Sequence, residues 1–184
     1  MWQLVAKIAK KLSEALSPVS GTEDAEAAVA LILRQTNESF DVLLVKRVKN
    51  PGDPWSGQTA LPGGKREPND KDLKHTVTRE TLEETNINLE NRCRFLGTMS
   101  IQHSNRRPEM RILPFVIFLK HEPTIRLNEK ELEGYAWISL KELDKHRGTA
   151  KFGFGEFPAY VMDDCVIWGL TYRIVEDFFH AIGG

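Results

Sequence analysis

The sequence predicts a single α/β domain in which a mixed sheet carries a helix on each side. Apolar, strand-like runs occur at residues 27–33, 41–47 and 110–119. Residues 70–85 and 168–179 have apolar positions at helical spacing. A chain of 184 residues is long enough for one core and too short for two ordinary domains.

The first eighteen residues predict an amphipathic helix, 1–18, ahead of a single domain at 19–184. Its apolar positions follow helical spacing, and its lysines lie mostly elsewhere: Trp2, Val5, Ile8, Ala9, Leu12 and Leu16 against Lys7, Lys10 and Lys11. A basic amphipathic helix can lie on a membrane or target an organelle. We favour the commoner outcome, in which its apolar face packs on its own domain or on a second subunit, so a homodimer is possible. The lysines argue against a cleaved secretory signal.

Two strands and a long loop follow. Residues 27–33 predict a buried strand and residues 41–47 the next, with the turn near 37–39. The loop at 50–64 is rich in Pro and Gly and holds Trp55. Trp55 either flanks a substrate or anchors the loop on the core.

The next helix carries three carboxylates on one face. It begins near Asp70 or Asp72, either of which could cap it, and runs to Thr85. The carboxylates, Glu80, Glu83 and Glu84, fall within an arc of roughly 100°, where like charges repel. A solvated acidic face is one interpretation. The Pro-Gly-Gly turn upstream and the adjacent arginine favour the other, a site for a hard divalent cation that also contacts substrate phosphates.

The rest of the chain predicts three more strands and two helices. Residues 95–100 form a strand, and the apolar run 110–119 forms another that is buried on both faces, with Pro114 marking an edge or a bulge. A short strand at 135–138 leads into Ser139, which has Glu142 three residues later, the spacing of a capping box. Residues 168–179 close the chain with an amphipathic helix. The aromatic, glycine-rich segment 152–160 either covers a flat group such as adenine or fills a hydrophobic seam.

The glycine turn and the acidic helix together resemble the Nudix box. The matching positions are Gly64, a spacer, and Arg79, Glu80, Thr81, Leu82, Glu83, Glu84, Thr85, Asn86 and Ile87. The resemblance implies a Nudix α/β/α sandwich with a central mixed sheet. It also implies a pyrophosphohydrolase that uses Mg²⁺ or Mn²⁺ to cleave a nucleoside diphosphate linked to another moiety.

The chain departs from the box in three places. Asn86 replaces the last glycine, a change we expect to be tolerated because Asn is the usual second choice for a left-handed helix end. Thr81 replaces a larger aliphatic residue, and the spacer is one residue longer. The early acidic position of the box falls on Asp70 or Lys71, depending on the end from which one counts, so it is left out of the metal set.

The run Gly-Gln-Thr-Ala-Leu-Pro-Gly-Gly at 57–64 resembles the coenzyme A pyrophosphatase branch of the family. This implies coenzyme A or a derivative as substrate. Arg47 matches the first arginine of that branch's upstream signature, but Val48 stands where a serine is expected. The alternatives are a house-cleaning pyrophosphatase of nucleoside triphosphates or dinucleotides, and a non-catalytic Nudix-fold module that binds a ligand.

The resemblance assigns residues to roles. Gly64, Glu80, Glu83 and Glu84 would hold the metal, and the three glutamates together with Glu131, six residues before Trp137, would act in catalysis. Arg47, Arg107, Arg111 and Trp55 are the candidates for substrate binding, since arginine forks fit phosphate oxygens. Arg79 either touches substrate or holds the carboxylates in place; we prefer the second role.

Composition excludes several other classes of protein. The formal net charge is −1, from 25 basic and 26 acidic residues, so no overall field attracts nucleic acid. Two cysteines, Cys93 and Cys165, do not suggest a disulfide framework and fit a reducing cytoplasm. Membrane insertion is not expected because no apolar run approaches the ~20 residues of a membrane span.

Overall fold

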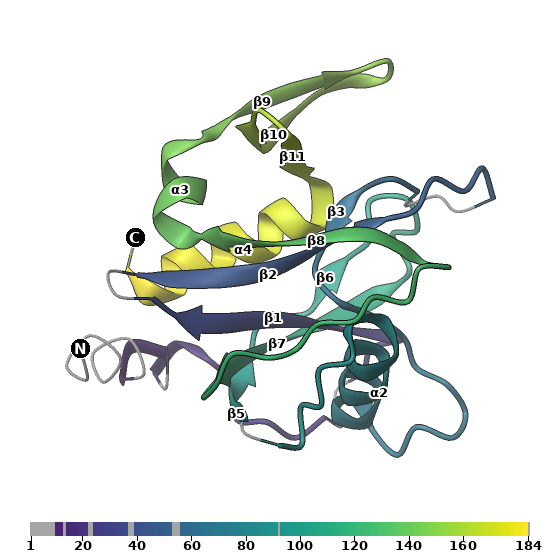
Figure 1. The fold of residues 1–184 in the computed structure, drawn as a ribbon, viewed down its shortest axis with the longest axis vertical. Coiled ribbons are helices and arrows are strands. Elements are labelled where there is room, and N and C mark those ends of the chain that lie inside the picture. Colours follow the sequence, from purple (N-terminus) through teal and green to yellow (C-terminus); the bar gives the residue numbers. More distant parts are fainter. Residues whose placement is uncertain are drawn as a thin grey trace.

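The computed structural model describes residues 10–12, 14–21, 24–36, 39–52, 56–91 and 93–183. Figure 1 shows the arrangement of the named elements along the chain. In order they are β1 (Ala27–Gln35), β2 (Phe40–Arg47), β3 (Thr59–Ala60), β4 (Gly63–Lys65), α2 (Leu73–Thr85), β5 (Cys93–Thr98), β6 (Gln102–His103), β7 (Arg111–Leu119), β8 (Leu132–Ser139), α3 (Leu140–Lys145), β9 (Arg147–Phe152), β10 (Gly155–Met162), β11 (Cys165–Trp168) and α4 (Gly169–Ile182).

The main sheet is mixed and has eight strands. Its central path is β3-β2-β1-β7-β5, and β4 pairs with β1, β6 with β7 and β8 with β2. The β1–β7 pair is parallel, and the other pairs are antiparallel. β1 pairs with β2 only near its C-terminal end and with β4 near its N-terminal end. The two strands therefore pair with opposite ends of β1, and the two glycines of the Pro-Gly-Gly turn lie in β4, opposite Val29 and Ala28.

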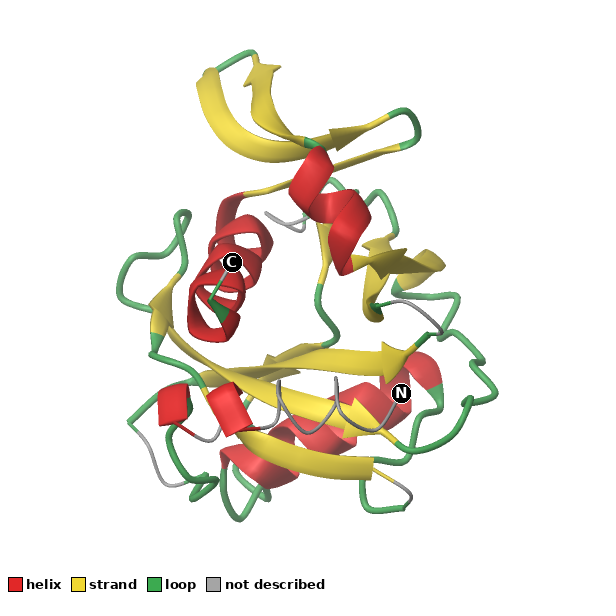
Figure 2. Ribbon diagram, turned by 90° about the vertical axis from the view of Figure 1, so that its left-hand side faces the viewer, coloured by secondary structure: helices red, strands yellow, loops and turns green. Residues whose placement is uncertain are grey.

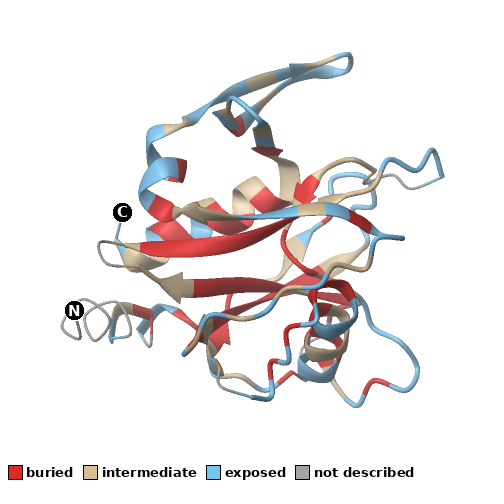
Figure 3. Ribbon diagram, viewed as in Figure 1, coloured by how far each residue is buried: buried red, intermediate tan, exposed pale blue. Residues whose placement is uncertain are grey.

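Helices cover both faces of this sheet, as the sequence predicts (Figure 2). Successive side chains of β1 point to opposite faces. Ala30 and Ile32 belong to the core under α2, whereas Leu31 and Leu33 belong to the core under α4. This is why the apolar run of β1 is continuous rather than alternating, and why β1, like its neighbours β2 and β7, is mostly buried (Figure 3). The predicted α/β fold with a central mixed sheet is confirmed.

Pro114 lies inside the sheet, so of its two predicted roles, to mark an edge strand or a bulge, the edge strand is wrong. β7 runs between β1 and β5, and Pro114 pairs with Val29 in the parallel ladder. The carbonyl of Pro114 accepts a hydrogen bond from the N–H of Met99, which lies in the break between β5 and β6. The missing N–H of proline thus faces the position where the neighbouring strand is interrupted. A register shift between Phe95 and Gly97 lies close by in β5.

A second, three-stranded antiparallel sheet, β11-β10-β9, stands beyond α4 (Figure 2). The sequence analysis does not predict this sheet, because the glycine-rich segment 152–160 carries no strand pattern; whether its rings cover a flat group or fill a seam is a separate question. They instead form the end of β9 and most of β10, with Phe152 opposite Gly155 at the tip of the hairpin. This sheet is held to α4 by Glu176, which accepts hydrogen bonds from Tyr160 and, at 2.9 Å, from Arg147.

The structure describes only part of the predicted N-terminal helix. Residues 10–12 and 14–15 are helical, and Leu12 and Leu16 are buried in the core under α4. Lys11 donates a hydrogen bond to the carbonyl of Ile182 at 2.7 Å. Residues 1–9 lie outside the described part of the chain, so the proposed 1–18 unit stays a prediction. Among the described residues, no helix is long and apolar enough to cross a membrane.

Candidate active site

α2 is fixed at both ends by caps that the sequence carries. Asp72, one of the two predicted caps, accepts a hydrogen bond from the N–H of His75 at 2.7 Å. At the other end Asn86 adopts the predicted left-handed conformation, with φ 62°, and its N–H reaches the carbonyl of Leu82. The two caps fix the residues at which α2 begins and ends, and thereby the direction in which each glutamate leaves the helix.

Three of the predicted acids share one cavity of about 310 Å³. Glu80 and Glu84 of α2 line it together with Glu131, which precedes β8. Glu84 is almost completely buried and Glu80 is mostly buried, with side-chain exposures of 3% and 17%. Glu83 points outward, with 55% of its side chain exposed, and does not line the cavity among the described residues. Arg47 and Gly64 line the same space, so five predicted residues meet there.

The glycine turn lies so close to β1 and to the acidic helix that a Cβ at either glycine would collide with a neighbour. A Cβ on Gly63 would stand 2.2 Å from the carbonyl oxygen of Ala28, and its φ is 140°. A Cβ on Gly64 would stand 2.4 Å from the carboxyl carbon of Glu80. The N–H of Gly63 donates to Glu84 Oε2 at 2.9 Å. The missing side chains of the two glycines therefore leave room for the carboxylates, and the N–H of Gly63 orients Glu84.

Arg79 links the acidic residues to each other. Its Nη1 donates to Glu80 Oε1 at 2.9 Å and to Glu83 Oε2 at 3.2 Å. Its Nε and Nη2 grip both oxygens of Asp70, at 3.0 and 2.8 Å. These are the contacts of a residue that positions the carboxylates, the role we preferred for it.

Asp70 is the buried anchor of this network. Its side chain is 1% exposed and also accepts hydrogen bonds from the Thr76 hydroxyl at 3.0 Å and the Glu67 N–H at 2.9 Å, and it contacts the ring of His75. The bonds from Arg79, above all, hold the pKa of Asp70 far below its usual range. Protein donors occupy the oxygens of Asp70, and Asp70 does not line the cavity. It therefore supports the site by holding Arg79 in place and does not contact the interior of the cavity.

Burial sets the electrostatics of the cavity. It raises the pKa of Glu84 to about 8, and the neighbouring charge of Glu80 adds to this. The Gly63 N–H and Arg47, whose Nη1 lies 4.0 Å from Glu84 Oε1, act in the opposite direction and are outweighed. Burial also raises the pKa of Glu80, partly offset by its bond with Arg79. Two crowded carboxylates of this kind gain from a cation between them.

The donor set fits a hard divalent cation in its chemistry. The cavity offers carboxylate oxygens from Glu80, Glu84 and Glu131 and backbone from Gly64, which suits Mg²⁺ or Mn²⁺. Their present positions are not those of a finished metal centre, since within the described ranges no three His, Cys, Asp or Glu side chains come together closely enough to hold an ion. Arg79 currently occupies one oxygen each of Glu80 and Glu83.

Two other predicted substrate residues, Arg107 and Arg111, do not line this cavity. Arg111, at the start of β7, pairs with Asp24 and Glu26, which raise its pKa, and it does not line the cavity. Arg107 is exposed in the loop before β7, where its N–H donates to Ser104. Trp55 lies outside the described residues. Sequence reasoning missed Leu170 and Thr171 of α4, which line the cavity although no local motif marks them.

Comparison with known proteins identifies the family. Residues 24–158 match the NUDIX domain. The chain is 31% identical over 176 residues to Nudix hydrolase 22, chloroplastic, of Arabidopsis thaliana, a match that covers 88% of this chain and 56% of that protein. It is 38% identical over 107 residues to an uncharacterised protein of Schizosaccharomyces pombe, covering 55% of this chain and 32% of that protein.

The chain thus spans about half, and about a third, of the length of these two relatives. Among solved structures it is similar to the NUDIX domain of Shewanella oneidensis NrtR complexed with ADP ribose. The TM-score is 0.55 at 16% identity, over 85% of this chain and 86% of that one, a likeness that shows the fold. Because the NUDIX domain match takes in well over half of the sequence, the chain belongs to the Nudix family.

Proposed function

We propose that the protein is a divalent-metal-dependent hydrolase of a pyrophosphate bond in a nucleoside diphosphate linked to another moiety. One observation carries the proposal. Glu80, Glu84 and Glu131 line a single cavity with Arg47 and the glycine turn. Carboxylates that hold a cation and an arginine that binds phosphate oxygens are the two things that cleavage of a pyrophosphate needs.

The residues divide the work as follows. Glu80, Glu84 and the backbone of Gly64 would hold Mg²⁺ or Mn²⁺, and Glu83, which adjoins them through Arg79, stays in our proposed set. Such a cation neutralises phosphate charge and acidifies water. Arg47, whose Nη1 lies 4.0 Å from Glu84 Oε1, would bind a phosphate oxygen next to the carboxylates. The carboxylates that line the cavity, Glu131 included, can accept the proton of the attacking water.

Coenzyme A or a derivative is our best candidate for the substrate. The supporting feature is the run at 57–64, of which Gln58, Ala60, Leu61, Gly63 and Gly64 all line the cavity. The run therefore lies where it can contact a substrate. We keep a house-cleaning pyrophosphatase of nucleoside triphosphates or dinucleotides as the alternative. Arg107, Arg111 and Trp55 remain proposed substrate contacts for parts of the ligand outside the cavity.

A cytoplasmic location is also part of the proposal. Cys93 and Cys165 are both free thiols, as expected in a reducing compartment. A homodimer through the N-terminal segment would give a concentration-dependent elution volume, and a monomer at all concentrations would exclude it.

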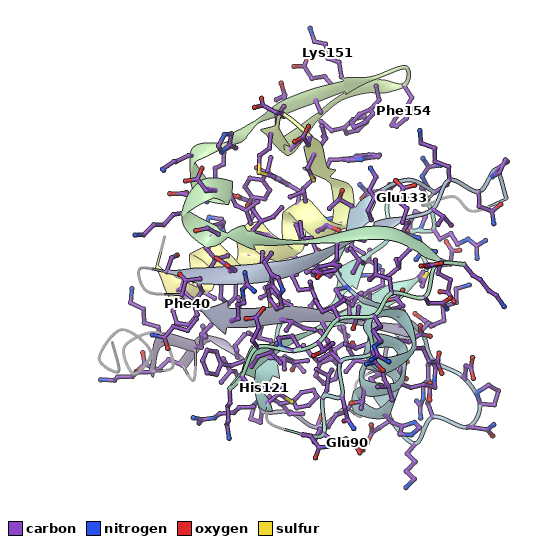
Figure 4. All side chains as sticks on the ribbon, in the orientation of Figure 1. Phe40, Glu90, His121, Glu133, Lys151 and Phe154 are labelled. Atoms are coloured by element: carbon purple, nitrogen blue, oxygen red, sulfur yellow. The ribbon has the colours of Figure 1, made fainter. Side chains whose placement is uncertain are left out.

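A product assay over a substrate panel tests the function. The panel holds coenzyme A, ADP-ribose, NADH, diadenosine polyphosphates and nucleoside triphosphates, each with Mg²⁺, Mn²⁺ or chelator. We expect metal-dependent cleavage, greatest for coenzyme A, and a loss of kcat of at least about 100-fold in Glu84→Gln. Glu90→Gln is the matched control, because Glu90 is exposed, follows the end of α2 and does not line the cavity (Figure 4).

The outcomes separate the candidate functions. Preferred cleavage of another panel member would keep the catalytic helix and discard coenzyme A. Full activity in both Glu83→Gln and Glu84→Gln would refute the site. Binding without cleavage of any panel member would favour a non-catalytic module.

A further inference from the structure

A second and larger cavity, of about 860 Å³, borders the acidic one, and the proposed function does not use it. It lies between the loop that follows β6, the tip of the β9–β10 hairpin and the start of α4. We call it the aromatic cavity and define it by Phe154, Phe157, Trp168, His103, Arg106 and Arg173, all of which line it. Its volume lies in the range of pockets that hold small ligands.

Residues that line one cavity are neighbours, in the chain and in the sheet, of residues that line the other. Trp168 lines the aromatic cavity, and Leu170 and Thr171, in the first turn of α4, line the acidic one. In the sheet, Gln102 of the aromatic cavity pairs with Ile112 of the acidic cavity. A molecule with its pyrophosphate among the glutamates can therefore extend directly into the aromatic cavity.

One wall is a cluster of aromatic rings that the fold leaves partly uncovered. Phe152 and Phe154 stack with ring centroids 5.5 Å apart, and Trp168 lies 4.4 Å from Phe152. Phe154, at the hairpin tip, is 62% exposed and lies on the side of the hairpin that faces the body of the molecule (Figure 4). Single exposed apolar residues are ordinary, but four neighbouring rings beside an open hollow are typical of a ligand site.

The opposite wall is polar and carries positive charge. Arg106 and Arg173 line it, and no Asp or Glu is among the described residues that line this cavity. Arg173 bonds to Gln102, Asn105 and the carbonyl of His103, and Asp177 accepts a bond from Gln102 at 2.6 Å. α4 thus fixes the loop, whereas Arg106 is exposed at its surface.

We propose that the aromatic cavity binds the purine base of the nucleotide half of the substrate, which stacks on Phe154 and Trp168 while Arg106 attracts the neighbouring anionic groups. The inference rests on the proposed function, because that places the pyrophosphate in the adjoining cavity. A flat aromatic base gains from ring stacking, whereas a flexible aliphatic chain has no need of ring faces.

The test uses Phe154→Ala, because an exposed side chain can be removed without disturbing the core. Calorimetry without metal measures binding of AMP and of ribose 5-phosphate, which lacks the base. We expect AMP to bind at least tenfold more tightly than ribose 5-phosphate to the wild type. Phe154→Ala should weaken AMP about tenfold and leave ribose 5-phosphate unchanged, and Phe154→Trp should restore binding.

The matched control is Val161→Ala, which removes an exposed apolar side chain from the same small sheet outside the cavity. For an adenine-bearing substrate of the panel, Phe154→Ala should raise KM about tenfold with kcat within twofold, the sign of lost uniform binding. If Phe154 only holds the hairpin together, Phe154→Ala will lower the thermal midpoint and leave AMP affinity per folded molecule unchanged. That result would overturn the proposal.

Failure of this inference can be told apart from failure of the proposed function. If the panel is cleaved but Phe154→Ala changes neither KM nor AMP binding, the base subsite is wrong and the hydrolase stands. If nothing is cleaved but AMP binding depends on Phe154, the subsite stands and the hydrolase falls.

Discussion

The metal-free protein should lose stability as pH rises, and Glu84 should be the main cause. Burial raises the pKa of Glu84 from 4.5 to about 8, so the folded state holds a proton that the unfolded state releases between these values. Where the unfolded state binds fewer protons, the free energy of unfolding falls with pH. For pKa values of 4.5 and about 8, the loss between pH 5 and pH 8 is about 3.5 kcal/mol. This is a large part of the 5–15 kcal/mol typical of a domain.

Urea unfolding in chelator at pH 5, 6, 7 and 8 measures this loss. Glu84→Gln should flatten the pH dependence, because glutamine still accepts the Gly63 bond and carries no charge. Glu83→Gln is the control, since Glu83 lies one residue earlier on α2 and is exposed. Added Mg²⁺ should stabilise the wild type more at pH 8 than at pH 5, because the cation binds the ionised form. Equal slopes in the wild type and Glu84→Gln would refute the argument.

Substitutions at three further positions probe the residues that support the site. Asp70→Asn should cost about 2–3 kcal/mol at neutral pH and should lower kcat because Arg79 loses its anchor. The cost should be smaller at pH 3, because the unfolded wild type then binds a proton at Asp70 while the folded state, in which the pKa of Asp70 is far lower, stays ionised. Urea unfolding at pH 7 and pH 3 and turnover assays check this, and an unchanged kcat would count against the positioning role. Gly64→Ala should lower kcat at least about 100-fold with little change in Tm, because the new Cβ displaces only the end of the Glu80 side chain; an active variant with normal kinetics would contradict the close approach. Asn86→Ala should destabilise by about 1 kcal/mol and Asn86→Gly should not, since φ there is 62°; equal denaturation midpoints for the two variants would remove the argument from backbone conformation.

The sequence predicts best where a residue's role depends on its near neighbours. Asn86 ends α2 in a left-handed turn because the helix end itself requires one. Arg79 reaches Glu80 and Glu83 because helical geometry brings them together. Glu83, by contrast, shares the acidic face and still points to solvent, since burial depends on which strand approaches the helix.

The three-stranded sheet was missed for a related physical reason. Its strands contain Gly148, Gly153, Gly155 and Pro158 around or within them and lack a clean alternation of apolar and polar residues. What stabilises them is contact with α4, above all through Glu176, which lies 16 residues beyond Tyr160. The sequence shows the aromatic rings of this segment, but it does not show that the loop after β6 lies opposite them.

The position of α4 has a consequence for how such chains diverge. The match to the NUDIX domain ends at residue 158, yet Trp168, Leu170, Thr171 and Arg173 supply walls to both cavities. Two chains could thus carry the same glycine turn and the same glutamates and still choose different substrates. Selection on the last helix can change which molecules are accepted while the acidic cavity keeps its glutamates. A fragment that ends at residue 158 would keep every residue of the Nudix box. It would lose α4, which forms one side of the cavity that these residues line.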